Sequence, residues 1–304
     1  MTPEEFLDLY AALPEVEQLE QAPREAAARM RAWERSHRRL ANRVPARTVL
    51  DHLYRAVAER VGRSGLCGIR FQARLLPKVK VYLECGAKRT FAAALDWPGW
   101  CRQGPNETDA LAALLHYGPK YATILAGTRL GFAAPTNLTQ LVVVEHLPGT
   151  ATTDFGALSV APTVDHDRSC VAADLKRFEK ILGAGWRAFD EAVKSARGKA
   201  LATGPRGGGR SLEAIVTHVI GADAGHLTAV GWKGPKAAKP PEQLAATREA
   251  ILAALKASAT GEIPSQGPRG GARWSARYFV RRVAWHVMAH VWEIERRAAM
   301  RSLP

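Results

Sequence analysis

The sequence predicts an α+β protein in which a helical arm and a small α+β unit precede a four-helix bundle. Two short β-prone runs, at 79–85 and 90–95, predict a strand pair, and four amphipathic stretches in the second half predict the bundle. Among the 304 residues, 47% are hydrophobic and 24% are charged. These are the proportions of a folded globular chain, so wholesale disorder, collagen and rod-like coiled coils are poor interpretations.

We expect three segments along the chain. A basic helical arm occupies residues 1–75, the small α+β unit occupies residues 76–150 and the bundle occupies residues 165–304. The stretch between the last two segments, residues 148–165, is rich in Thr, Gly and Pro, and we expect it to be a linker.

The small unit begins with the strand pair, which leads into a turn at 96–100, Asp-Trp-Pro-Gly-Trp. A helix is predicted from about 106 to 126, with acids in its first turn that suit the positive end of the helix dipole, and a third strand at 140–145. The strand pair, the Asp-x-Pro-Gly turn and the Ala/Leu-rich helix resemble the HicB-type antitoxin module over about 45 residues. Because the net charge here is near zero, the resemblance implies a packing or ligand-facing accessory unit rather than a nucleic-acid binder.

The second half of the chain has a helical periodicity of apolar residues throughout. Gly/Pro-rich loops and one Gly/Lys/Pro-rich crossing separate its four stretches. The stretches are 167–197, 211–229, 241–258 and 275–300. Four amphipathic helices of this length predict a four-helix bundle.

The formal net charge of +14 is unevenly distributed. Lys and Arg minus Asp and Glu gives +5 for residues 1–80, −1 for 81–164 and +10 for 165–304. Arginines recur along the arm from Arg24 to Arg47, and such an arm can bind nucleic acid or another anionic partner. The alternative, which we favour, is a solvated arginine-rich helix.

Composition also bears on the location and partners of the protein. No apolar run approaches the roughly 18 residues that a membrane span requires, and the N-terminus lacks the features of a signal peptide, so we expect a cytoplasmic protein without a membrane partner. The four cysteines lack CxxC spacing and predict neither a disulfide framework nor a zinc knuckle. A small-molecule substrate is the expected partner, and a homodimer is one assembly that the chain allows.

Three of the nine histidines occupy positions suited to one metal ion. His286 and His290 are four residues apart on the last helix, so their imidazoles project from one face on consecutive turns. That face is otherwise apolar, and His218 faces inward from the second helix of the bundle. Three neutral imidazoles suit zinc, nickel, iron or copper and leave a position for water or substrate. The alternative is a set of buried core histidines that hydrogen bonds satisfy.

The residues around these histidines carry a family resemblance. The segments 217–223, Thr-His-Val-Ile-Gly-Ala-Asp, and 285–293, Trp-His-Val-Met-Ala-His-Val-Trp-Glu, resemble the DinB/YfiT superfamily, with similarity over about residues 165–300. Members of that superfamily are four-helix bundles that hold a divalent metal with three such histidines. The resemblance implies a divalent transition metal, zinc or nickel, in this chain. The characterised members are thiol-dependent enzymes, including mycothiol- and bacillithiol-dependent S-transferases and a maleylpyruvate isomerase, so the resemblance also implies a low-molecular-weight thiol.

Further polar residues lie close to the histidines in sequence. Glu293 follows the second histidine of its helix by three residues and is the candidate catalytic residue, as a base or as the partner of a histidine N–H. Its alternative role is a surface acid at a helix end. Arg206 and Arg210 lie in the glycine-rich loop 204–211, and with Arg282 they are candidates to hold the carboxylates of an anionic thiol or substrate. Solvated loop arginines are the alternative for the loop pair.

Two functional hypotheses follow. The first is a divalent-metal-dependent enzyme, an S-transferase or isomerase that uses a low-molecular-weight thiol of the mycothiol kind. The second is a non-catalytic regulatory protein that recognises nucleic acid or another partner through the basic arm and the HicB-like module. In the second hypothesis the bundle holds metal without turnover. Salt-dependent nucleic-acid binding that disappears when residues 1–80 are removed would favour it.

Overall fold

The computed structural model describes residues 78–167, 169–203, 209–236 and 239–299. Contacts between residues divide the chain into two units, Met1–Ala73 and Arg74–Pro304, and all the described residues belong to the second unit. The predicted basic arm, residues 1–75, therefore lies outside the described residues. The boundary that we expect between the small α+β unit (76–150) and the bundle (165–304) therefore falls within Arg74–Pro304.

The described residues form one four-stranded sheet and seven α-helices, which confirms the α+β prediction. The strands are β1 (Val79–Cys85), β2 (Thr90–Ala94), β3 (Cys101–Gly104) and β4 (Leu141–Pro148). The helices are α6 (Glu107–Leu125), α7 (Ala151–Phe155), α8 (Thr163–Asp167), α9 (Ala172–Ala196), α10 (Leu212–Val230), α11 (Pro240–Ala259) and α12 (Ala276–Ala299), with a 3-10 turn at Leu138–Gln140. The four helices expected in the second half thus appear as α9 to α12.

The sheet has the strand order β3-β2-β1-β4. β1 pairs antiparallel with β2 through an alignment of Val81 with Ala94, which is the expected strand pair, and it pairs parallel with β4. β3 was not predicted, because it has only four residues and follows directly on the 96–100 turn. A parallel partner for β1 requires a crossover, and α6 lies within that crossover.

Helix α6 packs against β2 and β3. Asn106 caps the helix by accepting a hydrogen bond from the backbone N–H of Asp109 at 2.9 Å. The indole N–H of Trp100 donates to the carbonyl of Leu114 at 2.9 Å, and the hydroxyl of Tyr121 donates to the carbonyl of Pro98 at 2.9 Å. Both aromatic rings are fully buried, so they anchor the turn before β3 against the helix.

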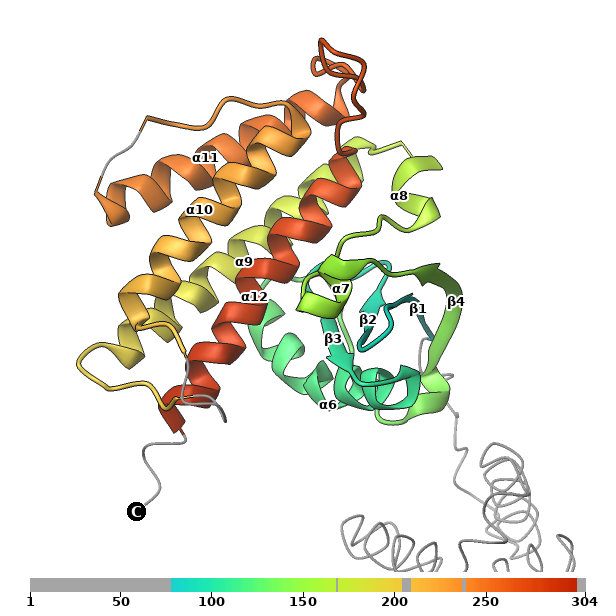
Figure 1. Cartoon of the computed structure of the whole chain (residues 1–304), viewed down its shortest axis with the longest axis vertical. Helices are drawn as coiled ribbons and strands as arrows, with labels where there is room; N and C mark the ends of the chain where they lie inside the picture. Colours follow the sequence, from blue (N-terminus) through green and yellow to red (C-terminus); the bar gives the residue numbers. More distant parts are fainter. Residues whose placement is uncertain (1–77, 168, 204–208, 237–238, 300–304) are drawn as a thin grey trace, which may run out of the picture. The chain divides into compact units, whose positions relative to one another are not determined.

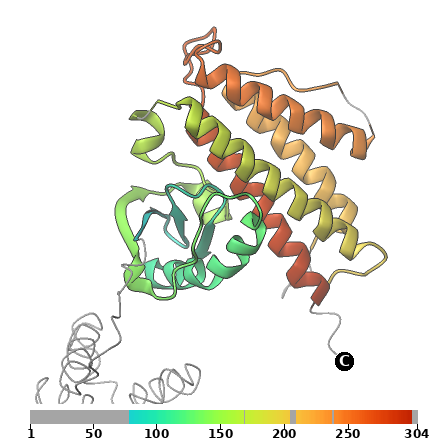
Figure 2. The same cartoon turned by 180° about the vertical axis from the view of Figure 1, so that it is seen from behind.

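The four long helices α9 to α12 lie side by side (Figure 1), and the view from behind shows α9 against α12 (Figure 2). α12 contacts each of α9, α10 and α11. Ser211 caps α10 by accepting from the N–H of Ala214, and Gly231 ends it in a left-handed conformation. α12 is therefore the central element of the described unit, and most of its side chains are buried.

The sheet and the bundle share one hydrophobic core. Met288 of α12 lies between the 96–100 turn and α9. A Cβ atom on Gly99 would approach the sulfur of Met288 to 2.4 Å, and one on Gly185 of α9 would approach its methyl carbon to 3.2 Å. Both glycines are therefore needed for the close packing of α12. Trp285 adds an edge-on contact with Phe91 of β2, with ring centroids 6.0 Å apart.

A buried ion pair joins α12 to the sheet. The Nε and Nη2 atoms of Arg281 donate to the two carboxylate oxygens of Asp165, at 2.6 and 2.8 Å. The same guanidinium donates to the carbonyls of Ala94 and Leu95, at 3.0 and 3.1 Å. Arg281 is 4% exposed and Asp165 is 2% exposed, so this network replaces the water that both charges lose.

The expectation of a linker at 148–165 is wrong. The segment contains α7, begins α8 and buries Leu158 completely. Glu84 of β1 is fully buried, and its carboxylate accepts hydrogen bonds from the hydroxyl of Thr153 at 2.5 Å and from the N–H groups of Ser159 and Val160. A Thr- and Pro-rich stretch can thus pack tightly when a buried acid supplies the acceptors.

None of the described helices combines the length and the apolarity that crossing a membrane requires.

Candidate metal centre

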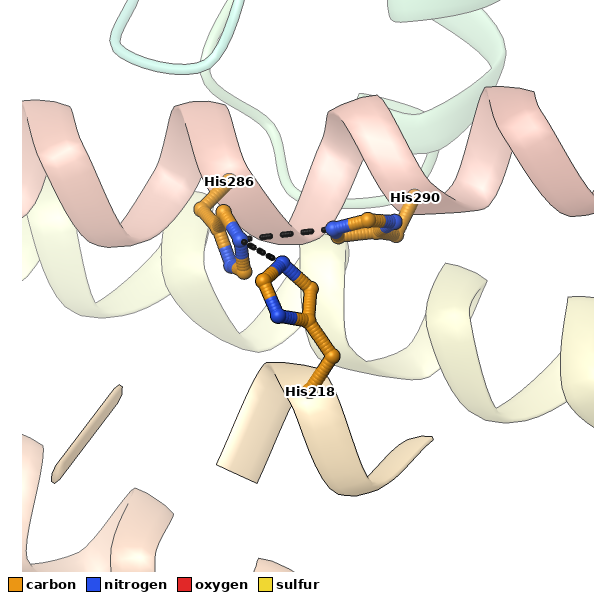
Figure 3. Close-up of side chains that lie close together, drawn as sticks. All are labelled: His218, His286 and His290. Carbon is orange, nitrogen blue, oxygen red and sulfur yellow. Dashed lines mark hydrogen bonds between the residues drawn. The ribbon is translucent and has the colours of Figure 1, made fainter. Parts of the chain in front are cut away.

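Three histidines from two helices converge at one point of the bundle (Figure 3). His286 and His290 project from one face of α12 on consecutive turns, as their spacing predicts, and both are buried. His218 faces them from α10 and is half-buried. In Figure 3 a nitrogen of each ring points toward the others. The structure therefore brings together all three residues that the sequence singled out as metal ligands.

The separations of the ring nitrogens suit one small cation. Nε2 of His286 lies 3.2 Å from Nε2 of His218 and 3.3 Å from Nε2 of His290. The potential ligand atoms of the three residues all lie within 4.8 Å of one another. Nitrogens bound at about 2.0–2.1 Å to tetrahedral zinc are about 3.3 Å apart, so two of these edges already have the length that a metal site needs. The cluster can bind a metal ion without rearrangement of the backbone.

The protonation states of the histidines also favour the binding of a cation. Burial, reinforced by the other histidines, lowers the pKa of His286 to about 2. Burial and the charge of Arg210 likewise lower the pKa of His218 below its usual value. Both rings are therefore neutral at neutral pH and offer lone pairs. Nδ1 of His286 is buried and makes no hydrogen bond with any described residue, so Nε2 is the nitrogen that this ring turns toward the other two histidines.

A carboxylate fixes the tautomer of one ligand. Nδ1 of His290 lies 2.8 Å from Oε2 of Glu293, so this nitrogen carries the proton and Nε2 keeps its lone pair for the centre. Nη1 of Arg297 donates to the other oxygen of Glu293 at 2.9 Å. These contacts, led by the hydrogen bond from His290, lower the pKa of Glu293 to about 2. Glu293 thus lies in the centre, as predicted, and contacts a ligand through a hydrogen bond.

A fourth histidine, His226, lies beside the cluster. Its place in the last turn of the helix predicted at 211–229 indicates a fraying end, but the structure buries the ring. The ring centroid of His226 is 5.7 Å from that of His286. Its Nδ1 lies 3.4 Å from Oδ1 of buried Asp223, an ion contact without hydrogen-bond geometry, and burial raises the pKa of that carboxyl group. The spacing of three residues between Asp223 and His226 was the available signal.

The described residues Ala202 and Gly209, which flank residues 204–208, lie against Arg297 near the end of α12. Arg206 lies outside the described residues, whereas Arg210 is exposed at the start of α10 and acts on His218 through its charge. Arg297 holds the loop by donating from Nε to the carbonyl of Ala202 at 2.8 Å. A Cβ atom on Gly209 would come within 2.6 Å of the Arg297 guanidinium, so the loop backbone lies directly against it. The carboxylate-holding role of both loop arginines stays a prediction.

In the part of the chain that the structure describes, no cysteine joins the histidine cluster. Burial raises the pKa values of the Cys85 and Cys101 thiols, so both remain protonated near neutral pH.

Comparisons of the chain with known protein families, with curated proteins and with solved structures find no significant match.

Proposed function

We propose that this chain is a divalent-metal-dependent enzyme of the DinB/YfiT type that uses a low-molecular-weight thiol, such as mycothiol, for S-transfer or isomerisation. The convergence of three imidazole nitrogens at separations that suit one ion carries the proposal. In this proposal the metal is zinc or nickel, two of the ions that three neutral imidazoles suit. When bound, such a cation stabilises a thiolate at neutral pH and so makes a thiol nucleophilic.

In this proposal the protein supplies the three metal ligands and a carboxylate that orients one of them. His218, His286 and His290 are the three ligands, and Glu293 keeps the proton of His290 on Nδ1. Both oxygens of Glu293 already accept hydrogen bonds, and its low pKa makes it a poor proton acceptor at neutral pH. Glu293 therefore acts as the partner of a histidine N–H, and the role of general base does not suit it.

The proposal assigns the reactive thiol to a small molecule. Cys85 and Cys101 are protonated, and no described cysteine belongs to the cluster. His218 is the least buried of the three ligands, so a small molecule approaches the centre from the α10 side. His226 packs beside His286, with ring centroids 5.7 Å apart, and contacts Asp223.

The test measures metal content and thiol-dependent turnover together. Full-length protein purified without a histidine tag is loaded with zinc or nickel, and consumption of 1-chloro-2,4-dinitrobenzene is followed with mycothiol. In this reaction the sulfur–carbon bond forms, chloride leaves and the thiol proton goes to solvent. We expect one metal per chain and a rate that falls to the uncatalysed value after chelation or in His286→Ala.

His116→Ala is the matched control, because His116 is exposed on α6 and belongs to no metal cluster among the described residues. It should keep the metal and the rate. Equal rates in loaded, chelated and His286→Ala protein would remove the enzyme proposal and leave the regulatory, partner-binding hypothesis in front.

A further inference from the structure

Arg282 lies one helical turn before His286 on α12. It is half-buried, and its charge is among the causes that lower the pKa of His286, so the guanidinium lies near that imidazole. A positive side chain beside a cation-binding centre makes the surrounding space favourable for an anion. A molecule that extends from the centre toward Arg282 therefore gains most if its far end is negatively charged.

Three aromatic rings enclose the guanidinium of Arg282. Its Cζ atom lies 5.2 Å from the ring centroid of Trp274, 5.9 Å from that of Tyr278 and 5.4 Å from that of Trp285. Nη1 donates to the carbonyl of Leu158 and, at 3.3 Å, to the hydroxyl of Tyr278. These contacts fix the plane of the guanidinium and use only one of its three nitrogens.

The opposite edge of the guanidinium has no partner. Nε is buried and makes no hydrogen bond, and Nη2 makes none with any described residue. In a planar guanidinium the N–H of Nε and one N–H of Nη2 point the same way, and this fork can donate to both oxygens of a carboxylate. No carboxylate of the described chain forms an ion pair with Arg282.

The other buried arginines of α12 differ in this respect. Arg277 pairs with Asp174, Arg281 pairs with Asp165 and Arg297 pairs with Glu293. Each of these pairs removes the need for an external anion. Aromatic enclosure alone can hold an unpaired guanidinium, since Arg102 stacks on Tyr117 and Trp292 without an ion pair among the described residues. Nε of Arg102 is likewise buried without a hydrogen bond, so the feature particular to Arg282 is that its unpartnered Nε and Nη2 belong to a residue one helical turn from His286.

We propose that Arg282 binds the carboxylate of a small organic substrate or thiol through Nε and Nη2, while the reacting end lies at the histidine centre. This assignment rests on the proposed function, because it takes the centre as the place of reaction. A carboxylate matches the fork with two parallel hydrogen bonds, and its single charge requires less desolvation among three aromatic rings than a phosphate dianion does. Arg282, rather than the loop arginines Arg206 and Arg210, is thus the residue that selects an acidic ligand.

The test compares two thiols of similar size that differ in charge. Cobalt(II)-loaded full-length protein is titrated with 3-mercaptopropionate and with 3-mercapto-1-propanol, and the thiolate-to-cobalt absorption reports binding. We expect wild-type protein to bind the carboxylate at least about tenfold more tightly, as a charge-assisted hydrogen-bond pair predicts. Arg282→Gln should reduce the ratio to about twofold or less, and Arg282→Lys, which keeps the charge but not the fork, should give an intermediate ratio.

Arg102→Gln is the matched control, because it removes an arginine from a second aromatic enclosure. It should keep the wild-type ratio, and cobalt content and thermal midpoint confirm that each variant is folded. Equal affinities of the two thiols for wild-type protein, or a ratio that Arg282→Gln leaves unchanged, would overturn the carboxylate site.

A failure of the proposed function has a different result, namely no thiolate-to-cobalt absorption with either thiol. Calorimetric titration with propionate and propanamide then tests carboxylate binding by Arg282 without a thiol. Propionate binding that is lost in Arg282→Gln supports the carboxylate site without thiol chemistry. Absence of propionate binding to wild-type protein overturns it.

Discussion

Arg281 and Arg282 are adjacent on α12 but lie on faces with opposite properties. Arg281 faces the sheet, where Asp165 and two backbone carbonyls occupy all three of its nitrogens. Arg282 lies on the face that carries His286, and the described residues leave its Nε and Nη2 without partners. The guanidinium of Arg281 thus has a structural role, whereas that of Arg282 keeps two nitrogens for a bound molecule.

The same contrast extends along the histidine side. Nδ1 of His286, Nδ1 of His226 and Oδ1 of Asp223 are all buried there without hydrogen bonds in the described structure. Such atoms lower the stability of a fold, and others lie in the sheet, such as the hydroxyl of Tyr82 and Nε of Arg102. Those beside the histidines differ because they lie next to a candidate metal centre. A stabilising face and a binding face therefore share one helix, and substitutions should separate their effects.

The largest expected effect is on metal binding. His290→Ala removes one of three ligands and also the hydrogen bond that Glu293 accepts, so the affinity for zinc should fall by more than about a hundredfold. Most of the helix content should remain, because alanine favours the helical conformation and the other buried side chains of α12 keep their packing. Metal analysis after dialysis against a weak chelator and circular dichroism check the two statements. Full zinc occupancy in His290→Ala would exclude the three-histidine site.

The next effect is on stability and concerns the opposite face. Arg281→Met leaves the buried carboxylate of Asp165 without its partner, so the free energy of unfolding should fall by about 3–5 kcal/mol. Arg248→Met breaks a pair with Asp190 that is half-exposed on the aspartate side, and its cost should stay within about 1 kcal/mol. Urea unfolding curves measure both values. Equal losses in the two variants would contradict the structural role of the sheet-facing side.

Glu293→Gln should have a smaller effect on metal binding than loss of a ligand. An amide can keep one contact with His290 but lacks the charge that fixes the proton on Nδ1, so zinc affinity should fall by about 10–100-fold. Arg297→Met should act in the same direction with a smaller loss of zinc affinity, because Glu293 keeps its hydrogen bond with His290. Competition with a fluorescent zinc chelator ranks the variants. Wild-type affinity in Glu293→Gln would show that this carboxylate does not support the centre.

Local spacing explains most of what could be predicted. The separation of four between His286 and His290 is fixed by helix geometry, and the apolar positions around them indicate a buried face. The number and extent of the long helices follow from the same periodicity. β1, β2 and α6 were also predictable, because their turn and cap residues lie within a few positions of each element.

Partners distant in sequence explain what could not be predicted. Arg281 and Arg282 are identical in type, and only the position of Asp165, more than a hundred residues earlier, distinguishes them. The Thr- and Pro-rich stretch at 148–165 suggests a linker until the buried Glu84 carboxylate is seen to hold it. His226 was assigned to a fraying end because the burial of that end depends on Trp274, which comes from another part of the chain.

The smallest expected effect is a dependence of the free energy of unfolding on pH that arises from the histidine side. Folded, metal-free protein holds His286 with a pKa of about 2, whereas in the unfolded chain the pKa is about 6.5. Between these values the unfolded state binds a proton that the folded state does not, so stability is highest above about pH 6.5 and falls as the pH decreases. The loss should be about 1 kcal/mol between pH 7 and 5.5, a window that lies above the titration of Glu293 in either state.

Urea unfolding of metal-free wild type and of His286→Gln at both pH values tests this. The variant should lose less stability than wild type on acidification, and identical losses would show that the buried imidazole does not remain neutral in the folded protein.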